Sequence, residues 1–520
     1  MRKMLLFAGA LLLAGCSGSP HSRTPQGELV VQLSGDPVTL DPSRAEDGHA
    51  LRILANTMDG LVGYDESGTL QLLLAESYRF SPDGKRVEFE LKRGVKWSDG
   101  APVVAADFIT AFRRLADPAT ASRTAGELLP IMNLRAIQAG KKPVQRLGVR
   151  ADGDNHLIFS LEHPAPYFVE ALSLPMALPL RRDVLKANGG EWPISAPVTG
   201  AYRIVERKPD RHILLAPNVL YWNAAAHSGA LKIRLIYVQD ESTGVSLFEN
   251  GKLDLLVRVP SLDVPRLRSQ GVLSASPFMA TYYLGFNLKK APFDQVEWRR
   301  AVAGSIHKTE ITDTLGIGDA PAWGWIPRGV EGYVPYRDLS QLFSGDMAKI
   351  KKMIAAEPIQ APTVTAAFDS SERNAMVMEK VQRDVEQALG LRLKLEGLDW
   401  KSHVAALHTD APQLYRFGWL APFGDPSPLL QIFITDNPNN YGHFHDAEYD
   451  KVSRQAMELR RGAEREHLIQ RAQRILIEEK AVIVPLYHYE QVFAVSAQLQ
   501  GFRANPSGTV LFRDIRKSAP

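Results

Sequence analysis

Cysteine, long apolar runs and an excess of one charge are all scarce in this 520-residue chain. Cys16 is the only cysteine, so an intramolecular disulfide is excluded. No apolar stretch beyond residues 5–14 approaches membrane-spanning length, and that one is itself too short for a permanent span. The formal net charge is +3, from 61 basic and 58 acidic residues, which argues against nucleic acid or an anionic membrane surface as a partner.

Catalytic and metal-binding motifs are missing as well. The sequence has no Gly-x-Ser-x-Gly, Walker loop, HExxH or CxxC. His443 and His445 would point to one face of a strand, and with His403 and His408 they leave a metal-dependent peptidase as a remote alternative. Because no further ligand stands at a usual spacing, we expect no metal, no cofactor and no enzymatic activity.

The N-terminus has the build of a secretory signal. A basic start, Met1-Arg2-Lys3-Met4, precedes the apolar run. The run leads into Leu13-Ala14-Gly15-Cys16, which resembles the bacterial lipobox. That resemblance implies a signal over residues 1–16, a lipid on Cys16 and a flexible tether over residues 17–27. The mature protein is then lipid-anchored outside the cytoplasm. In a Gram-negative host, Ser17 in place of an aspartate favours the outer membrane.

Size and periodicity indicate an α/β protein of two or three units. The chain is too long for one core, and its 45% hydrophobic and 23% charged residues are ordinary for a globular protein. Strands and helices alternate along it without a long all-α or all-β block. We expect strands at 28–33, 86–92, 202–205, 213–215 and 231–238, and helices at 47–59, 105–115 and from about 239 to 250.

The segment 416–426 combines features of a ligand-facing strand end. Arg416 can clamp a carboxylate, Gly418 permits close backbone approach, Trp419 offers a flat apolar face, and Gly424-Asp425-Pro426 forms a turn. A tryptophan before such a turn is, taken alone, more often core packing.

Several runs in the same order resemble family 5 extracellular solute-binding proteins, the peptide-binding components of ABC importers, and favour the oligopeptide-binding branch. These runs are Gly35-Asp36-Pro37, Lys96-Trp97-Ser98-Asp99-Gly100, Arg114-Leu115-Ala116-Asp117-Pro118, Thr199-Gly200-Ala201-Tyr202, Asn250-Gly251-Lys252-Leu253-Asp254 and Ala291-Pro292-Phe293-Asp294. The resemblance implies a two-lobed, type II periplasmic-binding-protein-like α/β fold with an extra third domain. It divides the chain into lobe I (28–75, 196–284 and 487–520), the extra domain (76–195) and lobe II (285–486), with hinge crossings near Tyr283 and Tyr487.

By the same resemblance, an extended peptide lies between the lobes and pairs with a short strand segment. The implied ligand-binding residues are Arg373, Trp400, Arg416, Gly418, Trp419, Leu420, Pro422 and Asp425. Gly418 and Leu420 would pair with the peptide backbone, and Trp419 and Trp400 would line its side-chain pocket. Arg416 and Arg373 would meet a carboxylate, although Trp400 could equally be core and Arg373 an ordinary surface arginine.

Pro422 departs from the family pattern. Members carry Trp-x-Ala-Asp, whose aspartate pairs with the peptide ammonium, whereas this chain has Trp419-Leu420-Ala421-Pro422. Asp425 aligns with a later acidic residue of the turn and is not an obvious substitute. A ligand with a blocked amino end, or a non-peptide solute, is therefore an alternative to a free peptide.

The resemblance also implies partners. We expect an oligopeptide or peptide-like ligand, an ABC permease with its ATPase subunits, a membrane reached through the lipid, and a monomer that binds no nucleic acid. An extracytoplasmic chaperone is a further remote alternative, which ligand-independent binding of unfolded proteins would reveal.

The lipid anchor leads to a first prediction. The Cys16→Ser variant loses the only thiol that can be lipidated, so it should stay unprocessed or fail to incorporate labelled fatty acid. Labelling with fractionation of cell membranes measures this. Normal labelling and membrane association of the variant would show that Cys16 is not the anchor.

Overall fold

The computed structural model describes residue 24 and residues 27–122, 130–226, 231–357 and 362–518. Cys16 and Ser17 lie outside this part of the chain.

Local sequence signals explain the first elements. The strand predicted at 28–33 is β1 (Glu28–Leu33), and the helix predicted at 47–59 is α1 (Gly48–Thr57). The Asp47 carboxylate begins α1 by accepting hydrogen bonds from two of its backbone N–H groups, at 3.0 and 2.8 Å.

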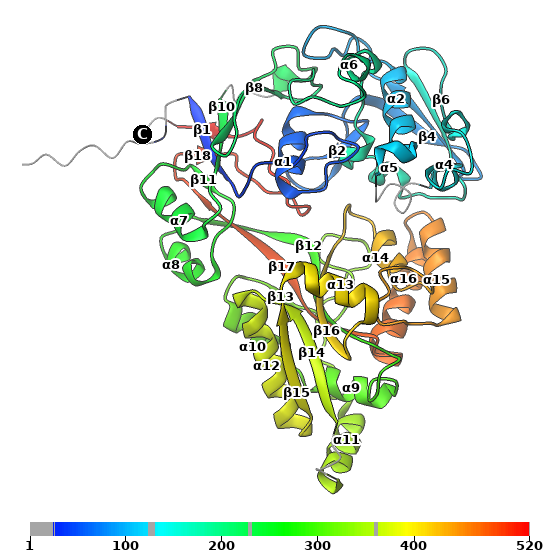
Figure 1. Cartoon of the computed structure of the whole chain (residues 1–520), viewed down its shortest axis with the longest axis vertical. Coiled ribbons are helices and arrows are strands. Elements are labelled where there is room, and N and C mark those ends of the chain that lie inside the picture. Colours follow the sequence, from blue (N-terminus) through cyan, green and yellow to red (C-terminus); the bar gives the residue numbers. More distant parts are fainter. Residues whose placement is uncertain (1–23, 25–26, 123–129, 227–230, 358–361, 519–520) are drawn as a thin grey trace, which may run out of the picture.

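One large mixed sheet runs through the molecule (Figure 1). Its strands in spatial order are β15 (Arg392–Leu398), β14 (Thr363–Asp369), β16 (Leu414–Leu420), β12 (Leu273–Phe286), β17 (Ile483–Val495), β11 (Leu255–Leu256), β1, β10 (Lys232–Tyr237), β9 (His212–Pro217) and β8 (Tyr202–Lys208), and β13 (Ala320–Pro321) also pairs with β17. Strands β8, β9 and β10 fall where the sequence predicted them.

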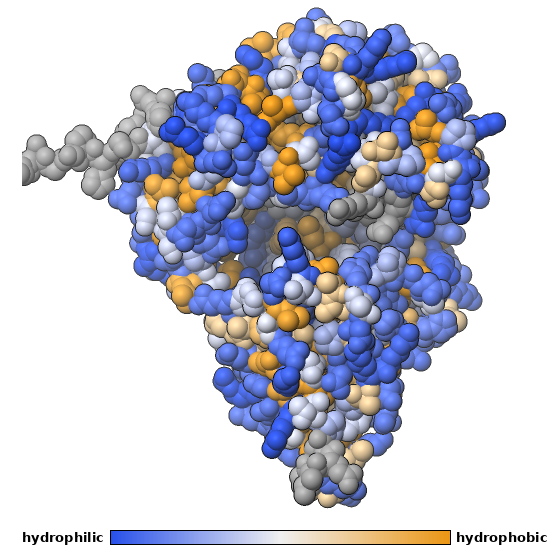
Figure 2. All heavy atoms as spheres, in the orientation of Figure 1, coloured by the Kyte–Doolittle hydropathy of each residue, from blue (hydrophilic) through white to orange (hydrophobic). Residues whose placement is uncertain are grey.

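The two longest strands, β12 and β17, join the halves of this sheet. They pair antiparallel along most of their length, but the register shifts between Pro277 and Thr281 and again between Tyr282 and Tyr283. In one half the sheet continues from β17 to its neighbours β11 and β1. In the other half it continues from β12 to its neighbours β16 and β14. The upper and lower halves in Figure 1 are therefore connected through this strand pair. A hollow separates them at the surface (Figure 2).

A separate four-stranded sheet, in the order β4 (Ala75–Phe80), β5 (Arg86–Leu91), β7 (His156–Ser160) and β6 (Val149–Ala151), belongs to the extra domain. In β5 the predicted alternation is confirmed, since Val87, Phe89 and Leu91 are buried. Short pairs are β2 (Val62–Tyr64) with β3 (Leu70–Leu72), and β18 (Leu499–Gln500) with β19 (Arg516–Lys517).

Helices cover the sheets, with α2 and α7 close to their predicted positions. They are α2 (Ala105–Ala116), α4 (Leu134–Gln138), α5 (Phe168–Ala171), α6 (Arg182–Ala187), α7 (Glu241–Glu249), α8 (Val264–Ser269), α9 (Val296–Ser305), α10 (Lys308–Leu315), α11 (Ser344–Ala356), α12 (Glu372–Leu389), α13 (Trp400–Asp410), α14 (Ser427–Gln431), α15 (Ala447–Glu458) and α16 (Ala463–Arg474). No helix among the described residues combines the length and apolar character that crossing a bilayer requires.

Hydrophobic side chains gather in separate cores. One core covers most of the lower half, a second lies in the extra domain and extends to α1 and β2, and a third lies around β1, β10 and β9. Phe423 connects the lower half with the second core. It follows β16 of the lower half, yet it is buried in the extra-domain core with its ring stacked on Tyr167, at a centroid distance of 6.3 Å. The turn after β16 thus fastens the lower half to the extra domain.

A buried histidine stands where the register of β12 and β17 shifts. His488 is 1% exposed, and one of its ring nitrogens, Nδ1, lies 3.0 Å from Thr281 Oγ1. Burial, together with the positive charges of Lys308 and Arg328, lowers the pKa of His488 to about 3. The native ring therefore stays neutral under conditions in which an exposed histidine takes up a proton.

From the lowered pKa of His488 we predict that the stability of the folded protein decreases in acid. Below about pH 6.5 the unfolded chain binds a proton that the native state excludes, so the free energy of unfolding should fall as pH falls, by up to about 1.4 kcal/mol per pH unit. Denaturant unfolding of the parent and His488→Gln proteins at pH 7 and pH 5 measures the difference. The variant should show the smaller pH dependence, whereas His467→Gln, at an exposed position, should match the parent. An unchanged pH dependence in His488→Gln would contradict the prediction.

Candidate functional site between the two lobes

The end of β16 has one open edge. Residues Arg416–Leu420 pair with β12 on one side, from Leu284 back to Ala280. On the other side β14 reaches only Leu414 and Tyr415, and no strand of the described chain continues the ladder along that edge. The open segment lies beside the β12–β17 junction. An unpaired strand edge is where an extended chain can add as a further strand.

Gly418 is required by the packing at this edge. A Cβ atom built there would lie 2.8 Å from the Tyr489 hydroxyl oxygen, a distance shorter than side chains tolerate. Tyr489 comes from β17, which is separated from β16 by β12, so the glycine leaves room for the hydroxyl end of this side chain. Leu420, at the outer end of β16, is 42% exposed. Gly418 and Leu420 thus lie on the edge where the sequence placed backbone pairing.

Three aromatic rings line the adjoining surface. Trp400 begins α13 and is 55% exposed, so it is not a core residue. Its ring stacks on Phe417, at a centroid distance of 5.8 Å and an interplanar angle of 22°. Trp419 lies 5.9 Å from the same phenylalanine ring and is half-buried. Exposed aromatic faces of this kind bind apolar side chains or rings.

Arg416 lies behind this surface and is only 8% exposed. Its guanidinium forms an ion pair with Asp369 at the end of β14, donates to the Tyr489 hydroxyl at 2.8 Å, and lies over the Tyr282 ring at 4.4 Å from its centroid. Burial disfavours the charged form, but Tyr489, Tyr282 and Asp369 outweigh it and raise the pKa of Arg416. Arg416 is therefore a permanent charge that the protein itself neutralises.

Arg373 is held in the same way. It pairs with Asp319, whose side chain is fully buried and also accepts the Glu490 backbone N–H at 2.9 Å. Its Nε atom donates to the Tyr487 hydroxyl at 3.1 Å, and its guanidinium lies over the Tyr487 and Tyr489 rings. Both arginines contact Tyr489 and therefore lie near each other, whereas the sequence interpretation treated both as free to bind an anion. Each already has an aspartate partner.

The sequence interpretation missed the residues that organise these arginines. Tyr282, Tyr487 and Tyr489 pack against one another, with ring centroids 4.6 to 6.1 Å apart. They come from β12 and β17, which lie about two hundred residues apart in the chain. No local spacing signals that arrangement. Asp369 stands four residues before Arg373, but its partner is Arg416, on another strand.

Pro422 and Asp425 lie in the turn that reaches the extra domain. Pro422 is half-buried between the buried residues Ala421 and Phe423. Asp425 is 1% exposed, and both its oxygens accept from Arg465 Nη2, at 2.8 and 2.7 Å. Its carboxylate also accepts from the Ser427 backbone N–H. Placing Asp425 among the ligand-binding residues is therefore not supported by its position, because its charge is consumed in a buried pair.

A network of contacts next to Asp425 joins three parts of the molecule. The Gly424 N–H donates to the Tyr64 hydroxyl at 2.9 Å, and that hydroxyl donates to Glu170 of the extra domain at 3.0 Å. Arg461 of the lower half pairs with the same carboxylate at 2.6 Å. A cavity of about 1020 Å³ lies beside these residues. Most of its polar groups form hydrogen bonds or ion pairs with one another, so the cavity belongs to the interface between the domains.

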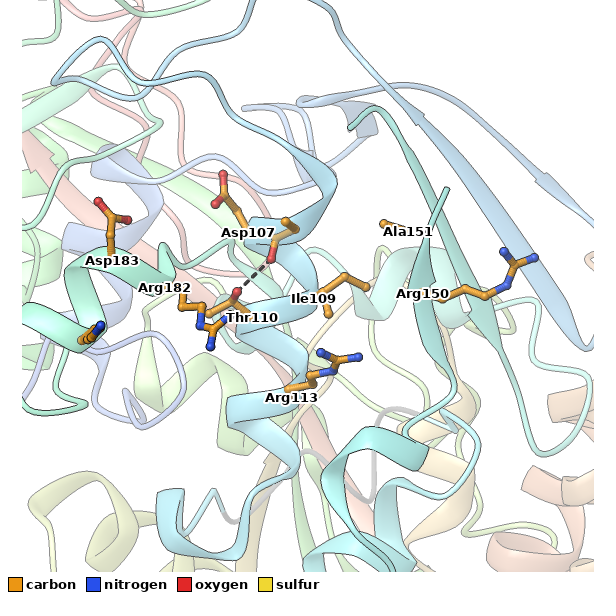
Figure 3. Close-up of a pocket in the computed structure, with 10 residues that line it drawn as sticks. Asp107, Ile109, Thr110, Arg113, Arg150, Ala151, Arg182 and Asp183 are labelled. Atoms are coloured by element: carbon orange, nitrogen blue, oxygen red, sulfur yellow. Dashed lines mark hydrogen bonds between the residues drawn. The ribbon is translucent and has the colours of Figure 1, made fainter. Parts of the chain in front are cut away.

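A second large hollow, of about 1030 Å³, lies on the extra domain (Figure 3). Its labelled side chains come from separate elements and point in different directions, as Arg113, Arg150 and Asp183 show. The Asp107 carboxylate accepts from Trp97 Nε1 at 3.0 Å and from the Val104 N–H at 3.1 Å, as a helix start requires. These groups do not converge on a common point, so the hollow lacks the character of a specific site.

The predicted histidine group is dispersed. His403 is buried with Nε2 2.9 Å from the Arg416 carbonyl oxygen, His408 packs against Tyr441, and His445 Nδ1 lies 3.0 Å from Thr435 Oγ1. Within the described ranges no three histidine, cysteine, aspartate or glutamate side chains gather as metal ligands.

Two halves joined by a strand pair, with an open strand edge and aromatic faces beside the joint, define a two-lobed solute-binding protein with an extra domain. The sequence matches bacterial extracellular solute-binding proteins, family 5 (Middle), over residues 69–441, and the chain belongs to that family. The fold and family expectations are therefore confirmed.

Relatives span nearly the whole chain. The probable deoxycholate-binding periplasmic protein YgiS of Escherichia coli is 30% identical over 507 residues, covering 94% of each chain. The unliganded open form of the periplasmic murein tripeptide binding protein MppA superposes with a TM-score of 0.82 at 27% identity, covering 95% of this chain and 98% of that one. The Haemophilus influenzae OppA complex with the peptide RPPGFSPFR gives a TM-score of 0.78 at 25% identity, covering 96% and 100%.

Proposed function

We propose that this protein captures oligopeptides or peptide-like solutes between its lobes and delivers them to an ABC permease with its ATPase subunits. The observation that carries this is the open edge of β16 beside the lobe junction, which can pair with an extended backbone. Trp400 and Trp419 flank that edge and would take the ligand's side chains. Relatives named for oligopeptides and murein peptides support the same class of ligand.

The location completes this proposal. The signal and lipobox expected over residues 1–16 would anchor the protein through Cys16, with the binding body outside the cytoplasm. Relatives are named as periplasmic proteins, which supports the compartment. The membrane that holds the lipid and the monomeric state remain part of the proposal.

Capture involves closure of the lobes. The proposed division is lobe I at 28–75, 196–284 and 487–520, the extra domain at 76–195, and lobe II at 285–486. The core of the lower half lies mainly within lobe II, which supports that part of the division. The register shift opposite His488 lies near the predicted crossings at Tyr283 and Tyr487, and a break in a ladder is where the two strands can bend.

Closure predicts a measurable compaction. Adding an N-acetylated tetrapeptide library to the protein should reduce the radius of gyration in small-angle scattering. The same addition should change tryptophan fluorescence, because the exposed Trp400 ring passes from water into the cleft. The Trp400→Phe variant should keep the compaction and lose much of the fluorescence change. An unchanged radius at saturation would argue against closure.

A second candidate ligand class follows from Pro422. Removing a peptide ammonium from water costs several kcal/mol unless a carboxylate compensates, and proline provides none. Asp425 could substitute only by giving up its buried ion pair with Arg465. Peptides with a blocked amino end, cell-wall peptides attached through that end, or non-peptide solutes would then bind better than free peptides. The relatives named for murein tripeptide and deoxycholate are consistent with such a shift.

Pro422→Asp tests this class. The new carboxylate should raise the affinity for free-amino tri- to pentapeptides by roughly 10- to 100-fold, within the range of desolvated charge pairs. Calorimetry would compare a free-amino peptide with its N-acetyl form. Pro422→Asn is the matched control, since it makes the same change of backbone and size without the charge. Tight and selective binding of the free-amino form by the parent protein would show that the amine is anchored elsewhere.

A further inference from the structure

We infer that Asp369 is a specificity-determining residue that excludes ligands with a free carboxylate at the Arg416 end of the cleft and favours ligands with a neutral, hydrogen-bonding group there. This inference rests on the proposed function, because it concerns the ligand of the same cleft. It replaces the expectation that Arg416 and Arg373 form an anion clamp.

Asp369 and Arg416 form an ion pair between two adjacent strands. Asp369 ends β14 and Arg416 lies on the neighbouring strand β16, so the two side chains meet across adjacent strands. The second Asp369 oxygen accepts from Asn374 Nδ2 at 2.9 Å. Asp369 is therefore held in place from both sides. It is a fixed part of the wall, and an incoming anion would have to displace it.

The Asp369 carboxylate and the Arg416 guanidinium differ in their exposure to an incoming ligand. The Asp369 side chain is 19% exposed and the Arg416 side chain 10%. Arg416 is also covered by the Tyr282 ring beneath it and by the Tyr489 hydroxyl. The acid is thus the more accessible member of the pair, and a carboxylate approaching Arg416 first encounters a like charge.

Replacing Asp369 by a ligand carboxylate as the partner of Arg416 has a cost in free energy. A ligand carboxylate that took the place of Asp369 would gain one ion pair and leave another carboxylate without its partner in a partly buried site. Arg373 offers no relief, because Asp319 already neutralises it and is itself fixed by the Glu490 N–H. The number of ion pairs stays constant while the ligand loses its hydration, so the anion gains nothing.

A neutral group avoids both penalties. A terminal amide can donate a hydrogen bond to Asp369 and accept one from the Tyr489 hydroxyl, without disturbing the ion pair. Pro422, which follows the other end of the open β16 segment, likewise provides no charge for a ligand terminus. The ligand class is an extended, amide-rich solute with neutral ends and at least one apolar side chain for Trp400.

Calorimetry on the full-length mature protein tests the role of Asp369. The probes are N-acetyl-trileucine and its C-terminal amide, which differ only in the terminal charge. We expect the parent protein to bind the amide at least threefold more tightly. In Asp369→Asn the shape and the contact to Asn374 can persist while Arg416 loses its counter-ion, so the carboxylate form should become the better ligand by about tenfold or more.

Two further variants complete the design. The double variant Asp369→Asn/Arg416→Gln removes both charges and should restore the preference for the amide, which a merely structural effect of Asp369→Asn would not do. Glu297→Gln removes a lower-half carboxylate from an exposed pair with Lys349 and should leave the parent preference unchanged. Thermal unfolding of each variant verifies its folding.

The outcomes separate the two levels of the argument. A parent protein that prefers the carboxylate, or a preference that is the same in Asp369→Asn as in the parent, overturns the role of Asp369 while leaving peptide capture intact. Binding of neither probe by any of the folded proteins counts against peptide capture itself and removes the basis for the inference with it.

Discussion

The antiparallel pairing of β12 with β17 is the constraint on which the rest of the structure depends. These two strands are the path by which the sheet of one lobe continues into the sheet of the other. The strands stay paired on both sides of the joint, but their register shifts twice, between Pro277 and Thr281 and between Tyr282 and Tyr283. The tyrosines that support the arginines, the buried His488 and the Gly418 contact all lie on or beside these strands, so the candidate site and the proposed hinge share one piece of backbone.

Three arginines of this region are neutralised in the same way. Arg416 with Asp369, Arg373 with Asp319, and Arg465 with Asp425 each place a guanidinium beside a carboxylate in a site with little access to water. An unpaired charge there would cost several kcal/mol, so each acid is committed to its base. The arginines of the cleft wall are thus electrically balanced, and the Trp400 ring is exposed beside them.

The turn after β16 connects the site with the extra domain. β16 carries the open edge, and three residues after its last residue Phe423 is buried against Tyr167. Gly424 and Arg461 then contact Tyr64 and Glu170 across the same interface. Any movement of the strand end that accompanies ligand binding must therefore be accommodated by this contact or transmitted through it.

Much of the architecture was determined by the sequence itself. Alternation in β5, the Asp47 cap of α1 and the β-branched run of β10 are local signals, because each depends on neighbours a few residues away. The ordered runs between Gly35 and Asp294 indicated the family. The position of Gly418 and Trp419 at a strand end beside a turn also followed from local patterns.

The charge state of the site was decided only by the tertiary structure. Arg416 and Asp369 are 47 residues apart, and Arg373 and Asp319 are 54 apart. Nothing in the spacing shows that strand pairing and a loop before β13 bring these partners together. The same is true of Asp425, which looks accessible in a turn but meets Arg465 from α16. Sequence specifies which side chains can carry charge, and folding decides which of those charges remain for a ligand.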